Sequence, residues 1–216
     1  DVTMEDLHDM PQQLYEGKIS KLREKTQGQL VIKEYPTASA HSGHFKSLMN
    51  ELALKKSFRP DVIFIDYLNI CASSRFKGGN ISSYFYVKAI AEELRGLAVE
   101  FNVPIFSATQ TTRTGYVSTD IGLEDTSESF GLPATADFMF ALISNEELEA
   151  LGQMKVKQLK NRYNDPSINR AFIIGVDRAK MRLYDVQQKA GDIVDANQVD
   201  EKEDAYNKFS DFKIWV

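Results

Sequence analysis

Short apolar runs alternate with stretches of helical periodicity along most of this sequence. Four of the runs have the length and composition of β-strands, and they lie at 29–36, 62–66, 103–110 and 137–143. Other stretches repeat apolar residues every three or four positions, as amphipathic helices do, and they lie at 12–24, 45–54 and 85–101. This alternation predicts a parallel sheet flanked by helices, because each helix returns the chain to the edge where the next strand begins.

Three further strand-like runs follow one another closely near the end of this pattern. They lie at 155–159, 171–176 and 181–186, and their connections, NRYNDPSIN and DRAK, have the composition of hairpin loops. The predicted fold class is therefore α/β, with a parallel, helix-flanked sheet that continues into an antiparallel meander. After residue 188 the chain becomes polar and acidic, so we expect a folded region at 1–188 and a polar C-terminal tail at 189–216.

The composition is that of an ordinary globular protein, with 43% hydrophobic and 26% charged residues among 216. A net charge of -5 argues against general electrostatic adhesion to nucleic acid, so a polyanion site requires a local basic patch. No apolar run approaches the length of a membrane span, and the polar start does not resemble a signal peptide. Cys71 is the only cysteine, which excludes an intrachain disulfide and favours a reducing, cytoplasmic setting.

An acidic residue, Asp66, closes the apolar run at 62–66. Ligands of open α/β sheets bind outside the carboxyl ends of the strands. A rigid strand that ends in one carboxylate is also what a Walker B element needs to hold hydrated Mg²⁺ on ATP. Many buried strands end in an acid, so the pattern alone is weak. The next predicted strand ends in Thr109 and Gln110, a polar pair at the equivalent edge, and this strengthens the nucleotide-site hypothesis.

Two cationic residues, Lys160 and Arg162, stand at the end of another predicted strand in LKNRYND. Their spacing of two residues directs both side chains to one face of the strand, from which they can reach a phosphate. The alternative is a solvated edge on which both cations extend into water. Spacing alone favours that alternative.

Other motifs have simpler explanations. The histidines of HSGH, at 41–44, lack a nearby third ligand, so entry into a helix explains them better than a metal site. Cys71 follows an apolar strand and is expected to be a packed, unreactive thiol. The polar stretch at 111–128 is long for a structureless connection, which is typical of functional or mobile loops.

Four segments, taken together, resemble one protein family. DVIFIDYLNI, FNVPIFSATQ, DTSESFGLPATADFMFALI and LKNRYND occur here in the order and spacing of the C-terminal RecA-like ATPase domain of DnaB-family (superfamily 4) replicative helicases. The resemblance is closest to the hexameric helicases of T-even-type bacteriophages, and it runs from DVTMEDL through GVDRAKMRLYDV. It implies that 1–188 is part of a RecA-like helicase motor domain.

This resemblance implies a role for each matching residue. Asp66 matches the Walker B aspartate that holds Mg²⁺, directly or through water. Gln110 matches a glutamine that senses the γ-phosphate of ATP. Lys160 and Arg162 match a K-x-R element that reaches the ATP bound by the neighbouring subunit of a hexamer, with Arg162 as the arginine finger.

The resemblance also implies a DNA-binding surface. The loops at 74–80 and 111–122 match segments that face the central channel of the ring. The basic side chains implied to follow a single strand of DNA there are Arg75, Lys77 and Arg113. Two acidic residues, Glu128 and Asp137, fall within a family motif without an assigned role, and Asp137 is also explained as the start of a strand.

One family motif is missing from the sequence. No G-x-x-x-x-G-K-[ST] pattern occurs, and SRFKGGNISS lacks its spacing. In the family, this phosphate-binding loop and the catalytic glutamate precede the part that aligns with Asp1. We therefore expect a helicase fragment that is inactive alone, from a protein that uses ATP and Mg²⁺. Its implied partners are single-stranded DNA, further copies in a ring hexamer, primase and a helicase loader, in the cytoplasm of a phage-infected bacterium. The alternatives are a non-catalytic RecA-like module for DNA binding or oligomerisation, and a RecA-type recombinase.

Overall fold

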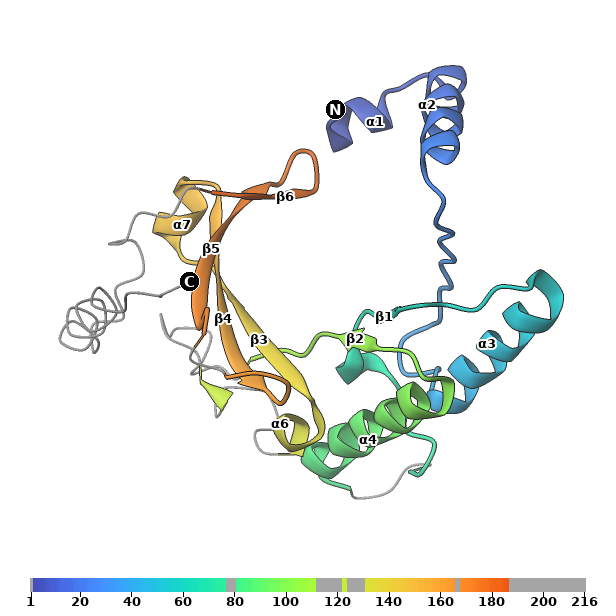
Figure 1. The fold of residues 1–216 in the computed structure, drawn as a ribbon, viewed down its shortest axis with the longest axis vertical. Coiled ribbons are helices and arrows are strands. Elements are labelled where there is room, and N and C mark those ends of the chain that lie inside the picture. Colours follow the sequence, from blue (N-terminus) through green and yellow to red (C-terminus); the bar gives the residue numbers. More distant parts are fainter. Residues whose placement is uncertain (1, 77–80, 112–121, 124–130, 166–167, 187–216) are drawn as a thin grey trace, which may run out of the picture.

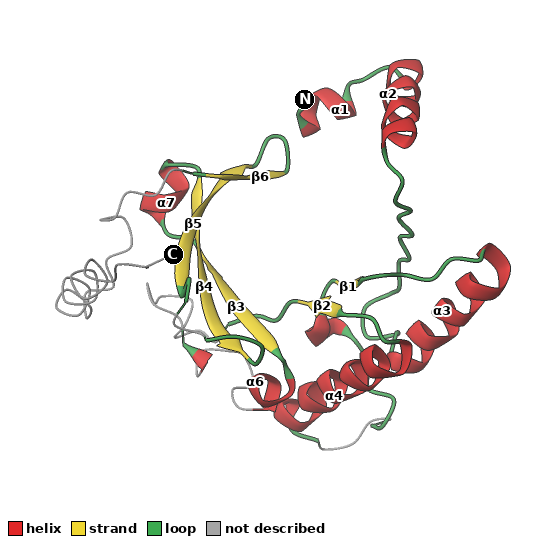
Figure 2. Cartoon of the chain, in the orientation of Figure 1, coloured by secondary structure: helices red, strands yellow, loops and turns green. Residues whose placement is uncertain are grey.

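The computed structural model describes residues 2–76, 81–111, 122–123, 131–165 and 168–186 (Figures 1 and 2). Its elements, in chain order, are α1 (Met4–His8), α2 (Gln12–Lys25), α3 (Ser42–Lys56), β1 (Ile63–Ile65), η1 (Leu68–Ile70), α4 (Ser83–Phe101), β2 (Ile105–Ser107), α6 (Gly131–Thr135), β3 (Phe138–Ile143), α7 (Glu146–Ala150), β4 (Gln153–Asn161), β5 (Ala171–Asp177) and β6 (Arg182–Asp185). The predicted tail at 189–216 lies outside the described residues, as do Lys77, Arg113 and Glu128.

The helix α4 supplies the largest share of the hydrophobic core among the described residues. Its buried side chains recur at helical spacing, and Ile90 is only 1% exposed. Together with η1 and α6, this face of α4 forms one cluster of buried residues, which also includes Cys71. The thiol therefore packs in the core as predicted, and burial raises its pKa. The predicted helices at 12–24, 45–54 and 85–101 are confirmed as α2, α3 and α4.

Strands β1 and β2 form a two-stranded parallel sheet. Ile63 pairs with Ile105 and Ile65 pairs with Ser107, while α4 makes the crossover between the two strands. Parallel neighbours need such a crossover, because the chain must return to the starting edge before it runs in the same direction again. The helix-linked parallel arrangement predicted for 62–66 and 103–110 is confirmed, with shorter strands.

A second sheet is antiparallel and has the order β3-β4-β5-β6. The predicted meander is confirmed, with longer strands than expected for β4 and β5. One expectation was wrong: the run at 137–143 was placed in the parallel sheet, but β3 pairs antiparallel with β4. The short connection through α7 explains this, because neighbouring strands joined without a long crossover run in opposite directions.

The predicted strand at 29–36 was also wrong. These residues form no strand in the structure, and the side chains of Leu30 and Ile32 are exposed. A strand requires a partner for its backbone hydrogen bonds, and none of the described strands lies against this segment. Apolar composition alone therefore misidentified an extended connection as a strand.

The two N-terminal helices lie apart from α3 and α4 (Figure 1). The backbone N–H of Met4 donates a hydrogen bond to the carbonyl of Ala179, 2.8 Å away, in the turn between β5 and β6. The start of helix α1 therefore contacts the β5–β6 turn of the antiparallel sheet. Within the described segments, no helix has both the length and the apolar composition that crossing a bilayer requires.

Candidate functional site

The carboxyl ends of β1 and β2 meet at one edge of the parallel sheet. The hydroxyl of Ser107 donates a hydrogen bond to the carbonyl of Ile65, at 2.8 Å. Just beyond the strands, the backbone N–H of Leu68 donates to the carbonyl of Ala108, at 3.1 Å. These bonds continue the pairing past the strand ends, so the residues that follow each strand are held beside each other.

Asp66 and Gln110 lie at this edge. Asp66 directly follows β1 and is exposed, and its carboxylate has no hydrogen-bond or ion-pair partner among the described residues. The side-chain amide of Gln110 donates to the hydroxyl of Tyr67 at 3.1 Å, and the hydroxyl of Thr109 donates to the side-chain carbonyl of Asn69 at 2.9 Å. Gln110 is thus connected to the residue next to Asp66, as expected for two groups at one sheet edge.

Lys160 and Arg162 reach a second location, the end of α6 and the turn that joins it to β3. The ammonium of Lys160 donates to the carbonyl of Pro133, and one Nη of Arg162 donates to the carbonyl of Ala134 at 2.8 Å. Both cations therefore lie on the same side of the end of β4, which their spacing predicted. Burial lowers the pKa of Lys160, and the neighbouring charge of Arg162 lowers it further.

An acidic residue at this turn joins two arginines. One carboxylate oxygen of Asp137 accepts a hydrogen bond from Arg162 at 3.0 Å, and the other accepts one from Arg95 of α4 at 2.6 Å. Arg95 also donates to the carbonyl of Thr135, at 2.7 Å. The hydrogen bond from Arg95 holds the pKa of the Asp137 carboxyl below its usual range, and Arg162 contributes in the same direction.

Sequence reasoning assigned no role to Arg95 or Asp137. Arg95 lies on the exposed side of α4, where a charged residue is ordinarily a solvated one. Asp137 was recognised only as part of a family motif or as the start of a strand. The tertiary structure groups these residues: Asp137 directly precedes β3, and the antiparallel pairing of β3 with β4 brings it beside Arg162.

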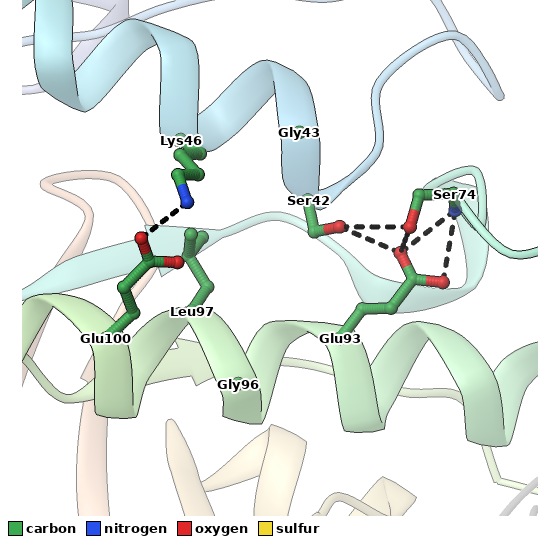
Figure 3. A pocket seen from close by; sticks show the side chains of 8 residues that line it. All are labelled: Ser42, Gly43, Lys46, Ser74, Glu93, Gly96, Leu97 and Glu100. Atoms are coloured by element: carbon green, nitrogen blue, oxygen red, sulfur yellow. Dashed lines mark hydrogen bonds and ion pairs between the residues drawn. The ribbon is translucent and has the colours of Figure 1, made fainter.

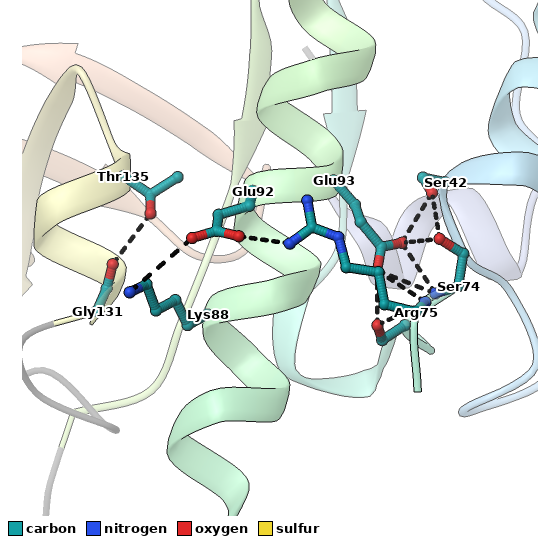
Figure 4. A network of polar contacts seen from close by, with 9 residues as sticks. Ser42, Ser74, Arg75, Lys88, Glu92, Glu93, Gly131 and Thr135 are labelled. Carbon is teal, nitrogen blue, oxygen red and sulfur yellow. Dashed lines mark hydrogen bonds and ion pairs between the residues drawn. The ribbon is translucent and has the colours of Figure 1, made fainter. Parts of the chain in front are cut away.

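Of the third group of predicted residues, those proposed to bind DNA, the structure describes Arg75. Arg75 is half-exposed and forms an ion pair with Glu92, whose other carboxylate oxygen lies 3.9 Å from the ammonium of Lys88 (Figure 4). This ion pair fixes the start of the loop at 74–80 against α4. The other two predicted DNA-binding residues, Lys77 and Arg113, lie outside the described residues.

A serine-rich clamp encloses the carboxylate of Glu93 beside this loop (Figure 4). It accepts hydrogen bonds from the hydroxyls of Ser42, Ser73 and Ser74 at 2.6–2.8 Å, and from the backbone N–H of Ser74. Partial burial favours the neutral acid, but these donors outweigh it and lower the pKa of Glu93 to about 2.

The pocket between α3 and α4 opens beside this clamp (Figure 3). Its charged side chains already have partners, since Glu93 accepts from the serines and Lys46 pairs with Glu100. His41 and His44 lie at the start of α3, where His41 accepts a hydrogen bond from the N–H of Gly43. They serve helix entry, as predicted.

The structure brings the predicted catalytic residues together in two pairs. No hydrogen bond or ion pair among the described residues links Asp66 or Gln110 to Lys160 or Arg162. In the same residues, no three carboxylate, histidine or cysteine side chains are grouped closely enough to hold a metal ion. A single carboxylate suits Mg²⁺, which keeps several waters and takes its other ligands from phosphates. The exposed Asp66 fits that requirement.

Comparison with known proteins identifies relatives. No protein-family model matches the sequence. A DnaB-like replicative helicase of Enterobacteria phage T4 is 41% identical over an alignment of 216 residues. The alignment covers 96% of this chain and 46% of the relative. The chain is a relative of DnaB-like replicative helicases. It spans about half the length of this helicase, and the family resemblance predicted from its motifs is confirmed.

Solved structures of helicase ATPase domains share the fold. One solved ATPase domain matches with a TM-score of 0.64 at 18% identity, over 79% of this chain and 60% of that one. A DnaB-like replicative helicase, described together with its interactions with primase, matches with a TM-score of 0.63 at 17% identity, over 79% of this chain and 41% of that one. The predicted RecA-like α/β fold is therefore confirmed.

Proposed function

We propose that this chain is part of a hexameric replicative helicase that couples ATP hydrolysis to movement along single-stranded DNA and to unwinding of the duplex. The observation that carries the proposal is the 41% identity to the phage T4 helicase along nearly the whole chain. The arrangement of the two residue pairs agrees with it. They lie in different places on one chain, which suits a site completed by two subunits.

The edge with Asp66 and Gln110 forms one side of the proposed site. Asp66 would hold Mg²⁺ directly or through water, and the ion would offset charge on the phosphates of ATP. Gln110 would face the γ-phosphate, and its side-chain amide donates a hydrogen bond to the hydroxyl of Tyr67, the residue after Asp66. The amide can exchange that bond for a phosphate oxygen, which would carry the presence of ATP into the loop that follows β2.

Lys160 and Arg162 supply the other side, acting on ATP bound to the neighbouring subunit. The guanidinium of Arg162 is half-exposed, and its planar fork of N–H donors matches the geometry of a phosphate. In related NTPases, an arginine finger that neutralises charge in the transition state accelerates hydrolysis by roughly 10³–10⁵-fold. Lys160 adds a second positive charge on the same side of the strand end.

The proposed partners follow from the same family. Arg75, Lys77 and Arg113 would contact the backbone of single-stranded DNA, which requires Arg75 to exchange Glu92 for phosphate. A solved DnaB-like helicase has been described with its interactions with primase. We propose that primase, a helicase loader and further copies of the chain are partners of this protein.

The test uses the product of the complete reading frame that contains the codons for these residues. We expect ATPase activity that single-stranded DNA stimulates, and a fall in kcat of about 10³-fold in Arg162→Ala. Arg178→Ala is the matched control, because Arg178 is another exposed arginine with one carboxylate partner, Glu149. Equal kcat values in wild type and Arg162→Ala would contradict the assigned role.

The alternative function is a non-catalytic RecA-like module that binds DNA or oligomerises. It is favoured by the lack of a G-x-x-x-x-G-K-[ST] pattern in these 216 residues. The sequence of the reading frame before the codon for Asp1 decides between the two functions. A phosphate-binding loop encoded there supports the helicase, whereas DNA binding without ATP turnover by the complete product supports the module.

A further inference from the structure

We propose that Asp137 is the positioning residue for Arg162, and that Arg95 fixes Asp137 in turn. This inference rests on the proposed function of Arg162. Asp137 holds the guanidinium in one orientation before a neighbouring subunit arrives, so that its remaining N–H donors face the incoming phosphate.

The contacts at the α6–β3 turn hold Arg162 at several points. Its Nη1 donates to a carboxylate oxygen of Asp137 at 3.0 Å, and its Nη2 donates to the carbonyl of Ala134 at 2.8 Å. Its backbone N–H also donates to the backbone carbonyl of Asp137, at 3.0 Å. The guanidinium and the backbone of Arg162 are thus both attached to the segment that runs from α6 into β3.

The same contacts leave Arg162 able to bind a second anion. Arginine has five N–H donors, and these two partners each take one, which leaves three without a partner among the described residues. The side chain is half-exposed, so part of it is open to a ligand from outside the chain. A contact that blocked the finger would cover the guanidinium more completely.

Asp137 is itself fixed from the opposite side. Arg95 occupies its second carboxylate oxygen at 2.6 Å and reaches the carbonyl of Thr135 at 2.7 Å. Arg95 projects from α4, whose other face is buried in the core. A carboxylate with both oxygens occupied, one by a residue on a rigid helix, is a more precise support than a single surface ion pair.

Prior orientation matters because arginine is long and flexible. A free guanidinium samples many rotamers, and only a few of them place its donors against a phosphate. Misplacement of a catalytic group by about 1 Å can lower a rate by roughly 100-fold. Misplacement of the Arg162 guanidinium would slow the chemical step, so it would reduce kcat more than it would change KM for ATP.

The test compares kinetics of variants in the product of the complete reading frame. In Asp137→Asn we expect kcat to fall by about 10-fold or more, with KM for ATP changed by less than about 2-fold. Asp137→Glu, which keeps the charge, should recover part of the loss, and Arg95→Ala should show a smaller fall. Glu149→Gln removes an exposed ion pair to another arginine, Arg178, and should leave kcat unchanged.

The double variant Asp137→Asn/Arg162→Ala separates positioning from a structural role. If Asp137 acts through Arg162, the double variant should turn over as slowly as Arg162→Ala alone, measured with radiolabelled ATP. Losses that multiply in the double variant would overturn the inference. So would a rise of kcat in Asp137→Asn, because that result marks Asp137 as a residue that sequesters the finger.

The outcomes also distinguish this inference from the proposed function. If Arg162→Ala is inactive while Asp137→Asn is fully active, only the positioning role of Asp137 is contradicted. If Arg162→Ala is fully active, or if the wild type has no ATPase activity, both the positioning role of Asp137 and the proposed function of Arg162 are contradicted. A readout independent of catalysis is the set of NMR signals of the Arg162 Nη–H groups in this chain, because Nη1 is the donor to Asp137. These signals should be shifted away from the free-arginine region in wild type and in Glu149→Gln, and should move toward that region in Asp137→Asn; unmoved signals would overturn the inference.

Discussion

The carboxylate of Glu93 shows how one residue can join three segments of the chain. Its hydrogen bonds connect α4 to Ser42, at the start of α3, and to Ser73 and Ser74, which lead into the loop at 74–80. Because an ionised carboxylate accepts these bonds more strongly than a neutral acid does, the clamp depends on the charge of Glu93. The loop proposed to contact DNA is thus held at its base by one ionised group.

The clamp predicts a pH-dependent stability. The pKa of Glu93 is about 2 in the folded chain and near 4.5 when unfolded, so its stabilisation is complete above pH 4.5 and disappears as the pH falls through 2. At pH 7, Glu93→Gln should lower the free energy of unfolding by about 1–3 kcal/mol. This difference from wild type should shrink on acidification. Urea unfolding at a series of pH values measures it.

The matched control for that prediction is Glu51→Gln. Glu51 is exposed on α3, and its partner among the residues that the structure describes is Lys55 one turn away, a type of pair that contributes little to stability. Its substitution should leave the free energy of unfolding nearly unchanged. A difference between wild type and Glu93→Gln that stays constant from pH 7 to pH 2 would contradict the role of the charge.

Among the elements, the β5–β6 hairpin depends on one close approach. Gly175 of β5 pairs with Tyr184 of β6, and a Cβ at Gly175 would lie 2.3 Å from carbon atoms of the tyrosine ring. Only glycine lets the ring lie across the strand at this point. The hairpin also carries Ala179, which binds the start of α1. Its geometry therefore affects the position of the N-terminal helices.

Gly175→Ala should accordingly destabilise the chain. Displacement of the Tyr184 ring is expected to lower the free energy of unfolding by about 1–3 kcal/mol, as overpacking does elsewhere. The control is Gly17→Ala in α2, where a Cβ meets no atom within 4 Å and should add about 0.5–1 kcal/mol of stability. Thermal and urea unfolding of the two variants measure these opposite effects. Equal stabilities would show that the ring moves without penalty.

At the scale of the molecule, the parallel sheet leaves an apolar face exposed. Phe64 of β1 and Phe106 of β2 stack with ring centroids 5.3 Å apart, and they are 73% and 47% exposed. The sheet has only two strands among the described residues, so backbone groups at its edges also lack strand partners there. Apolar faces and open edges of this kind promote association between chains.

We therefore expect the 216-residue chain to self-associate as its concentration rises. Phe64→Ser should shift the equilibrium toward monomer in light scattering or sedimentation, because it removes apolar surface from the exposed face. Leu54→Ser is the control, since Leu54 is an apolar residue on α3, outside this sheet, and is even more exposed than Phe64. A wild type that stays monomeric at high concentration would contradict the expectation.

Local patterns were enough to predict the features that depend on neighbouring residues. Apolar spacing located α2, α3 and α4, because one helical face must be apolar to pack on a core. The apolar runs before Asp66 and Gln110 indicated two strands with their polar ends at one edge. The motifs around these residues were also specific enough to indicate the DnaB-like family, which the identity to the phage T4 helicase confirms.

Only the tertiary structure decided which distant segments meet. The apolar run at 29–36 has no strand partner among the described strands, and β3 joins the antiparallel sheet; a strand exists only through hydrogen bonds to another segment, which its own sequence does not specify. Asp137 meets Arg95 and Arg162 across 42 and 25 positions of sequence. No local pattern encodes contacts over such separations, because they arise from the packing of α4 and β4 around the α6–β3 turn. The residues were visible in the sequence, but their grouping was a property of the fold.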